Sequence, residues 1–136
     1  MSDQDQIQAV ARIYEAFGRA DVPFILNALA SDVEWEFDAK QNYSIPWYVP
    51  GRGIKTVTNF FENLARELEI TKFNILGIGK VGDFVVDAVE IEATVRKTGK
   101  TLKDFEVHIW KFNNAGKVSH FKHVIDTIHH QAVSRE

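Results

Sequence analysis

The segment from Phe105 to Phe112 places one histidine, His108, among aromatic and β-branched residues, a pattern typical of a strand. In such a setting a histidine is either a core side chain bonded to a backbone carbonyl or a proton-handling group in an apolar pocket. The second role is chemically available because imidazole titrates near neutral pH. Strand alternation favours the inward side for His108, so we predict that it acts as a catalytic acid, base or hydrogen-bond donor.

A second catalytic candidate, His123, lies in the next predicted strand, over residues 117–125. His123 shares a face with Phe121 and Ile125 and is predicted to be a pocket base. If His108 and His123 come from neighbouring strands, a ligand or a water could connect them as donor and general base.

Two aspartates each have two interpretations. Asp126 closes an apolar strand directly before Thr127, so it is either the N-cap of the tail or a pocket acid paired with a histidine. Asp87 shares strand parity with Val85 and Val89, and an unpaired carboxylate is costly to bury. Asp87 is therefore either an inward functional group or turned outward by a local bulge, and the bulge is the interpretation that we favour.

The histidines do not form a metal-binding motif. His120 and His123 are three residues apart, so on a strand they point to opposite faces and cannot share one ion. His129 and His130 are adjacent and lie in the polar tail. We therefore predict no metal ion and no cofactor.

Aromatic residues are the unusual part of the composition, with ten Phe, three Trp and three Tyr beside a single Met. Rigid rings fill cores well, but they also line pockets for flat apolar ligands. The candidates for a substrate-binding wall, each of which plain core packing would explain as well, are Tyr14, Trp35, Phe37, Trp47, Phe60, Trp110 and Phe121.

The totals predict one domain over residues 1–136, long enough to bury a core without disulfides. The chain has no cysteine, a net charge of −3 and scattered basic residues, so neither thiolate chemistry nor a nucleic-acid interface is expected. Its first residues lack the layout of a signal peptide, and no apolar run is long enough for a membrane span. We predict a cytoplasmic protein.

Helices are predicted in the first half of the chain. Apolar spacing after the cap candidate Ser2 predicts a helix that ends at Gly18. Asp21 is a second N-cap candidate with Pro23 in its first turn, and a third helix follows Gly53.

Alternating patterns predict strands over residues 32–37, 72–78, 83–95, 101–112 and 117–125, and a loop over residues 38–52 that folds over something apolar. The polar tail is expected to form one helical turn or a frayed end. The fold class predicted from this order is α+β: a cone-shaped, curved, antiparallel or mixed sheet wrapped around three N-terminal helices, enclosing an apolar pocket. Strands that are apolar on both faces also favour a homodimer through the sheet.

Three segments in this order resemble the nuclear-transport-factor-2-like superfamily, and more closely its SnoaL-like polyketide cyclase branch. They are AFGRADVPFILNALASDVEWEF at residues 16–37, IPWYVPGRGIKTVTNFFENLA at 45–65, and VHIWKFNNAGKVSHFKHVIDT at 107–127. The resemblance covers nearly the whole chain and implies the fold described above. This fold hosts isomerases, cyclases, hydrolases, transport factors and non-catalytic binders, so it does not by itself imply one function.

The ketosteroid isomerase branch implies a role for His108, because the strand that resembles the isomerase's carries its protonated oxyanion-hole aspartate at this position. A histidine there can donate to a developing enolate. The isomerase's general-base aspartate, however, corresponds to Phe37. Its oxyanion-hole tyrosine corresponds to Ile13, with Tyr14 about 100° further round the helix. Steroid isomerisation by that mechanism is therefore not expected.

Two other relatives were compared in the same way. The catalytic aspartate of limonene epoxide hydrolase corresponds to Asp126, but its water-holding tyrosine and asparagine correspond to Trp35 and Phe37. The histidine-tryptophan-aspartate of the SnoaL cyclase resembles the segment from His120 to Lys122, in which the lysine replaces the acid.

The resemblance and the residues together predict cofactor-free acid–base chemistry on a flat apolar carbonyl compound: isomerisation, cyclisation or dehydration. The alternative is a non-catalytic small-molecule binder of the same fold. A protein-interaction module is a third interpretation, supported only by the two-sided apolar sheet.

Overall fold

A computed structural model describes residues 1–37 and 44–136, apart from the side chain of Phe37. Phe37, a predicted wall residue, therefore lies outside the described side chains. In the described part of the chain no helix is both long and apolar enough to cross a membrane.

The three N-terminal helices begin where their caps predict. Helix α1 (Asp3–Gly18) starts with a capping box, in which the Ser2 hydroxyl accepts from the Asp5 amide and the Asp5 carboxylate accepts from the Ser2 amide. Helix α2 (Val22–Asn27) follows Asp21, whose side chain accepts from the Phe24 amide. Helix α3 (Ile54–Glu67) follows Gly53, which has a φ of 91° that a residue with a Cβ rarely adopts.

Six strands form one mixed sheet. They are β1 (Leu29–Phe37), β2 (Gly51–Arg52), β3 (Leu68–Val81), β4 (Phe84–Val95), β5 (Thr101–Phe112) and β6 (Val118–Val124). Their order is β2-β1-β6-β5-β4-β3, with β1 parallel to β6 and every other pair antiparallel. β1 and β3 extend beyond the predicted strands, and β2 lies in the segment predicted as loop.

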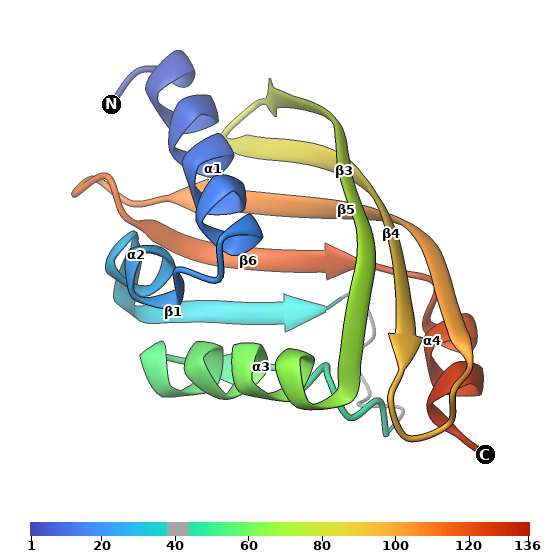
Figure 1. The fold of residues 1–136 in the computed structure, drawn as a ribbon. Coiled ribbons are helices and arrows are strands. Elements are labelled where there is room, and N and C mark those ends of the chain that lie inside the picture. The colour runs from blue at the N-terminus through green and yellow to red at the C-terminus, as the bar shows by residue number, and fades with distance from the viewer. Residues whose placement is uncertain (38–43) are drawn as a thin grey trace.

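The sheet is strongly curved but does not close, and α1 and α3 lie against its concave face (Figure 1). This confirms the predicted fold class. Tyr14 and Phe17 of α1 pack on Phe73 of β3 with ring centroids 5.8 and 5.1 Å apart, and Phe60 of α3 packs on Trp35 of β1 at 5.5 Å. Aromatic rings therefore fill the space between helices and sheet.

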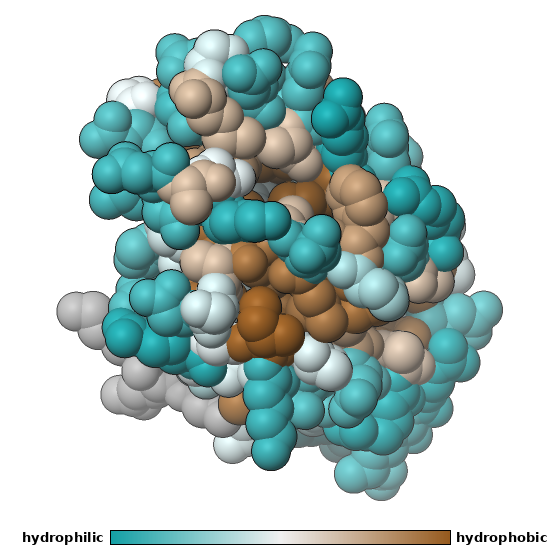
Figure 2. Space-filling view, turned by 90° about the vertical axis from the view of Figure 1, so that its left-hand side faces the viewer, coloured by the Kyte–Doolittle hydropathy of each residue, from teal (hydrophilic) through white to brown (hydrophobic). Residues whose placement is uncertain are grey.

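One side of this space is open. A hollow of about 1120 Å³ lies among α1, α2, α3 and β3, bordered by residues such as Ala11, Val22, Leu64 and Phe73. On this face of the molecule, apolar side chains gather around a depression (Figure 2).

The C-terminal tail forms an eight-residue helix, α4 (Thr127–Ser134), rather than a single turn or a frayed end. Asp126 is its N-cap, since its carboxylate accepts from the His129 amide at 3.1 Å, and Asp126 itself is exposed. The structure thus places Asp126 away from the interior, against the pocket-acid interpretation and in agreement with the N-cap alternative.

Candidate functional site

The space between helices and sheet narrows to an aromatic pocket. Its wall comes from α1, α2, α3, β1, β3, β4, β5, β6 and the segment before β2, and consists of Ile13, Tyr14, Phe17, Ile25, Trp35, Tyr48, Phe60, Phe61, Leu64, Ile70, Phe73, Ile91, Glu106, His108, Trp110, Phe121 and His123. The pocket has a free volume of about 50 Å³, which is enough for a few water molecules. Because Phe17, Leu64 and Phe73 border both spaces, the pocket opens into the larger hollow.

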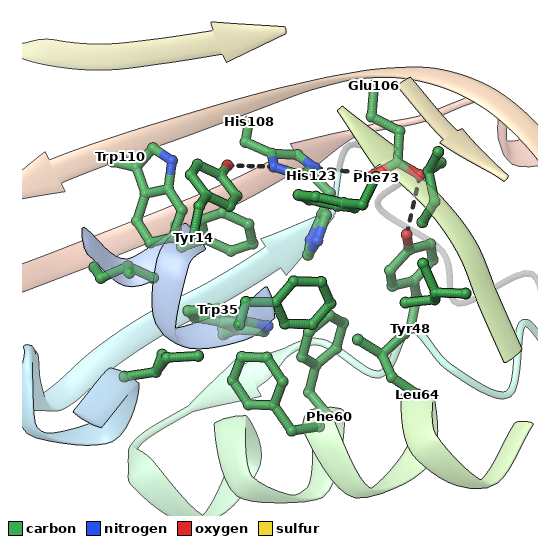
Figure 3. A pocket seen from close by; sticks show the side chains of 17 residues that line it. Tyr14, Trp35, Tyr48, Phe60, Leu64, Phe73, Glu106, His108, Trp110 and His123 are labelled. Atoms are coloured by element: carbon green, nitrogen blue, oxygen red, sulfur yellow. Dashed lines mark hydrogen bonds and ion pairs between the residues drawn. The ribbon is translucent and has the colours of Figure 1, made fainter. Parts of the chain in front are cut away.

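A chain of short hydrogen bonds begins at this wall (Figure 3). The Tyr14 hydroxyl lies 2.6 Å from His108 Nδ1 and 2.7 Å from Asp87 Oδ1. His108 Nε2 lies 2.9 Å from Glu106 Oε1, and the Trp110 indole donates to Asp87 Oδ2 at 2.8 Å. All five side chains are buried, so the contacts operate away from bulk water.

The contacts from Asp87 through Tyr14 and His108 to Glu106 can be satisfied by the same number of protons in three ways. In the first, His108 is protonated between two carboxylates. In the second, Asp87 holds a proton, donates it to Tyr14, and Tyr14 donates to His108. In the third, Glu106 holds the proton and donates it to His108. Each arrangement has the same total charge, so a proton can move along the chain without a change in net charge.

Burial and hydrogen bonding make the two ends of this chain unequal. Burial raises the pKa of Asp87, despite the opposing effects of His108 and the hydrogen bonds from Tyr14 and Trp110. Burial alone would also raise the pKa of Glu106, but hydrogen bonds from His108 and His130 outweigh it and lower that pKa well below its usual range. Glu106 is therefore the end of the chain that favours the ionised form, and Asp87 is the end that binds a proton more readily.

Glu106 is held from behind by a second set of contacts. Its Oε2 accepts from the Tyr48 hydroxyl at 3.2 Å and lies 3.3 Å from His130 Nε2, which is also 2.6 Å from Asp104 Oδ2. Burial alone would lower the pKa of His130, but its hydrogen bonds to Asp104 and Glu106 outweigh it and raise that pKa. The Trp47 indole donates to His130 Nδ1 at 3.1 Å, so a second proton on this ring would displace that bond.

This second set corrects the prediction for Trp47. Trp47 is buried, but it supports His130 and is not part of the pocket wall. Its role is to orient the imidazole that holds Glu106.

His123 lies beside His108 on the pocket wall. The two residues are register partners on β6 and β5, and their ring centroids are 4.8 Å apart in a T-shaped arrangement. The structure therefore brings these two predicted residues together on neighbouring strands. Burial lowers the pKa of His123 to about 3, so the ring is neutral at physiological pH. One of its ring nitrogens carries a hydrogen, and the other can accept a proton.

Two groups of donor atoms lie close enough to share a metal ion. Atoms of Glu106, His108 and His123 fall within 4.8 Å of one another, as do atoms of Asp104, Glu106 and His130. In each group one hydrogen bond between a histidine and a carboxylate, His108 with Glu106 or His130 with Asp104, accounts for part of the short spacing.

Trp35 differs from the other polar wall residues. It is 3% exposed, stacks on Phe121 with ring centroids 4.1 Å apart, and lines the pocket. Among the buried side-chain nitrogens and oxygens of the described residues, its Nε1 is the one atom without a hydrogen-bond partner. Leaving such a donor buried and unpaired costs about 1–3 kcal/mol.

The structure also corrects two interpretations of polar residues. Asp87 is 2% exposed and points inward, because β4 and β5 pair without a register shift from Phe84 to Thr94, so the predicted outward bulge is wrong. Tyr14 and Ile13 both line the pocket, and the Tyr14 hydroxyl reaches His108 although the resemblance assigned the tyrosine position to Ile13.

Sequence reasoning missed two polar residues of the pocket wall, Glu106 and Tyr48. Glu106 has the same strand parity as His108 and Trp110, so alternation along β5 carried the signal that could have revealed it. Tyr48 lies in an irregular segment with no periodicity, and the sequence carried no local signal for its contact with Glu106. Of the other predicted wall residues, Phe60, Trp110 and Phe121 lie at the pocket.

Comparisons with known proteins agree with this architecture. The model of the family described as SnoaL-like domain matches residues 10–121. No curated protein matches the sequence.

Solved structures share the fold over nearly the whole chain. A nuclear-transport-factor-2-like protein of unknown function from Burkholderia pseudomallei is 26% identical, with 100% of each chain covered and a TM-score of 0.83. TerC, co-crystallised with polyporic acid, is 22% identical, with 97% of this chain and 99% of that chain covered and a TM-score of 0.80. An epoxide hydrolase of M. tuberculosis, similar to limonene epoxide hydrolase, is 14% identical, with 96% and 90% covered and a TM-score of 0.72.

Proposed function

Because the chain belongs to the SnoaL-like domain family, we propose that its pocket binds a flat, apolar carbonyl compound and moves protons on it without a cofactor. The observation that carries this proposal is the chain of short hydrogen bonds from Asp87 through Tyr14 and His108 to Glu106, which ends at the wall of an aromatic pocket. A chain that relocates a proton without changing its charge is suited to general acid–base catalysis.

The reaction class is proton transfer next to a carbonyl group, as in isomerisation, aldol-type cyclisation or dehydration. Tyr14 and His108 hold the proton at the wall and exchange it with the substrate. Beside His108, the His123 imidazole is neutral because burial lowers its pKa to about 3. Negative charge that develops on a substrate beside this imidazole favours its protonated form, so His123 becomes a stronger base as the reaction proceeds.

A non-catalytic binding protein is the second candidate. It is favoured by the fact that both ring nitrogens of His108 already have partners, Tyr14 and Glu106, so the network also serves as a satisfied polar core. In that case the pocket still takes the same flat apolar ligand, but no proton is transferred to it.

Hydrogen–deuterium exchange distinguishes the two candidates without knowledge of the natural substrate. Simple aryl ketones such as acetophenone and 1-tetralone are incubated with the protein in D₂O, and loss of the α-proton signal is followed by NMR. We expect the protein to accelerate this exchange and His108→Ala to abolish the acceleration. The matched control is His120→Ala, which removes an exposed histidine of β6 that lies outside the pocket and pairs with Glu34.

Each outcome of this experiment separates the proposals. Ketones that bind without faster exchange would exclude enolisation and support the binder. Equal loss of exchange in His108→Ala and His120→Ala would show that the activity does not depend on the pocket network.

We also propose a homodimer through the outer face of the sheet, in the cytoplasm. Phe105 is 59% exposed on this face, beside the half-buried Val107 and Ile109. Apolar side chains at the centre of an open sheet face favour a covering partner. Light scattering should give a dimer mass for the wild type and a monomer mass for Phe105→Glu, and a wild-type monomer at micromolar concentration would contradict this part of the proposal.

A further inference from the structure

The three tryptophans of the chain are all buried, and they differ in one respect. The Trp47 indole donates to His130 Nδ1 and the Trp110 indole donates to Asp87 Oδ2. The Trp35 indole has no partner among the described residues. A buried indole N–H normally finds an acceptor, so the exception calls for an explanation.

The surroundings of the Trp35 ring are apolar among the residues that the structure describes. Its ring lies against Phe121, Phe60 and Phe61, with centroid separations of 4.1, 5.5 and 6.2 Å. Phenyl rings have no lone pair to accept a conventional hydrogen bond. Trp35 lines the pocket, where Figure 3 labels it, so an atom of a bound ligand is a candidate acceptor for this donor.

The other polar side chains of the described pocket wall already have hydrogen-bond partners. The Tyr14 hydroxyl bonds to Asp87 and His108, and the Tyr48 hydroxyl bonds to Glu106. The His108 ring nitrogens contact Tyr14 and Glu106, and His123 makes a backbone hydrogen bond at Glu36. A ligand oxygen that took any of these donors would have to break an existing bond, whereas Trp35 gains one.

We propose that the Trp35 indole N–H is the recognition donor for the carbonyl oxygen of an uncharged ligand. None of the described wall residues is a lysine or an arginine, and Glu106 contributes a carboxylate, so a ligand with its own carboxylate would meet like charge and no lysine or arginine to pair with it. This inference deepens the proposed function, on whose ligand pocket it rests.

The position of Trp35 also orients the ligand. Its ring centroid lies 6.3 Å from that of His123 and 6.3 Å from that of Trp110. A ligand whose carbonyl oxygen binds the indole therefore lies beside His123, whose ring centroid is 4.8 Å from that of His108.

The test uses two probes of the same shape. Acetophenone carries the carbonyl oxygen, and α-methylstyrene has a CH₂ group in its place. We expect the wild type to bind acetophenone about 10-fold more tightly than α-methylstyrene, the preference that one hydrogen bond between neutral groups confers. Trp35→Phe keeps an aromatic ring but removes the donor, and we expect it to abolish this preference. Both affinities are measured by NMR titration, so loss of packing, which affects both probes, cancels in their ratio.

Two further measurements keep the proposal falsifiable. In protein labelled with ¹⁵N-tryptophan, acetophenone should shift the Trp35 indole signal, identified by its absence in Trp35→Phe, and leave the Trp47 signal in place. Trp47→Phe is the control variant: it removes an indole that already has a partner and that lies outside the pocket wall, so it should lower the melting temperature and retain the preference for the ketone.

The proposal is overturned if the wild type binds both probes equally, if the Trp35 signal does not move, or if neither probe binds. The last result would also overturn the pocket proposal. A preference for the ketone without hydrogen–deuterium exchange would instead support Trp35 and exclude only the catalytic function.

Discussion

Removal of the Tyr14 hydroxyl tests the centre of the polar network. The hydroxyl is 2.7 Å from Asp87 Oδ1 and 2.6 Å from His108 Nδ1, and Tyr14→Phe removes both bonds while keeping the ring. A buried hydrogen bond to a charged group is worth about 1.5–3 kcal/mol. Since Asp87 Oδ1 and His108 Nδ1 are only 3.5 Å apart, they can close on each other and recover part of this energy. We therefore expect the free energy of unfolding to fall by about 2 kcal/mol.

Tyr48→Phe is the matched control. It removes the same atom from another buried tyrosine, but its acceptor Glu106 keeps contacts with His108 and His130. We expect a loss of about 0.5–1 kcal/mol, the usual value for a hydrogen bond whose acceptor keeps other partners.

Urea unfolding followed by tryptophan fluorescence measures both variants, and thermal melting gives a second readout. For a chain of this size, a loss of about 2 kcal/mol corresponds to a fall in melting temperature of roughly 6 °C or more. If the free energies of unfolding of Tyr14→Phe and Tyr48→Phe differ by less than about 0.5 kcal/mol, the Tyr14 hydroxyl does not connect Asp87 with His108 and the proposed proton chain is wrong.

Two further variants test other parts of the site. In the folded state the pKa of His123 is lowered to about 3, so between that value and the unfolded value near 6.5 the unfolded chain binds more protons and stability falls as the pH drops. His123→Phe should reduce this slope, by up to about 1.4 kcal/mol per pH unit, in urea unfolding between pH 5 and 6.5, and an unchanged slope would contradict the buried neutral imidazole. Asp126→Ala removes the N-cap of α4, so the free energy of unfolding should fall by about 1 kcal/mol while ketone binding and hydrogen–deuterium exchange stay intact. Loss of the exchange in a folded variant would show that Asp126 takes part in the catalytic site.

The helices and most strands were predictable because their signals are local. Ser2, Asp21 and Gly53 mark helix starts through side chains and backbone angles that act within a few residues. The alternation along β5 predicted the inward side of His108 for the same reason, since successive side chains of a strand point to opposite faces.

The pairing of His108 with His123 was partly predictable. Both are inward residues of consecutive strands joined by a short turn, so their proximity follows from hairpin geometry. Asp87 shows the limit of this reasoning. Strand alternation predicted that its side chain points inward, but the cost of burying an unpaired carboxylate favoured an outward bulge. Tyr14 and Trp110 are those partners, and they offset that cost.

The amino-acid sequence by itself determined the order of the elements, the inward side of β5 and the stock of aromatic rings, because each depends on periodicity or composition. Only the tertiary structure decided which polar groups meet. Tyr14 is 94 residues from His108, and Trp47 is 83 residues from His130. The same packing engaged the indole N–H groups of Trp47 and Trp110 and left that of Trp35 without a partner among the described residues. Contacts at such separations arise from the curvature of the sheet and the seating of α1 against it, which no local pattern encodes.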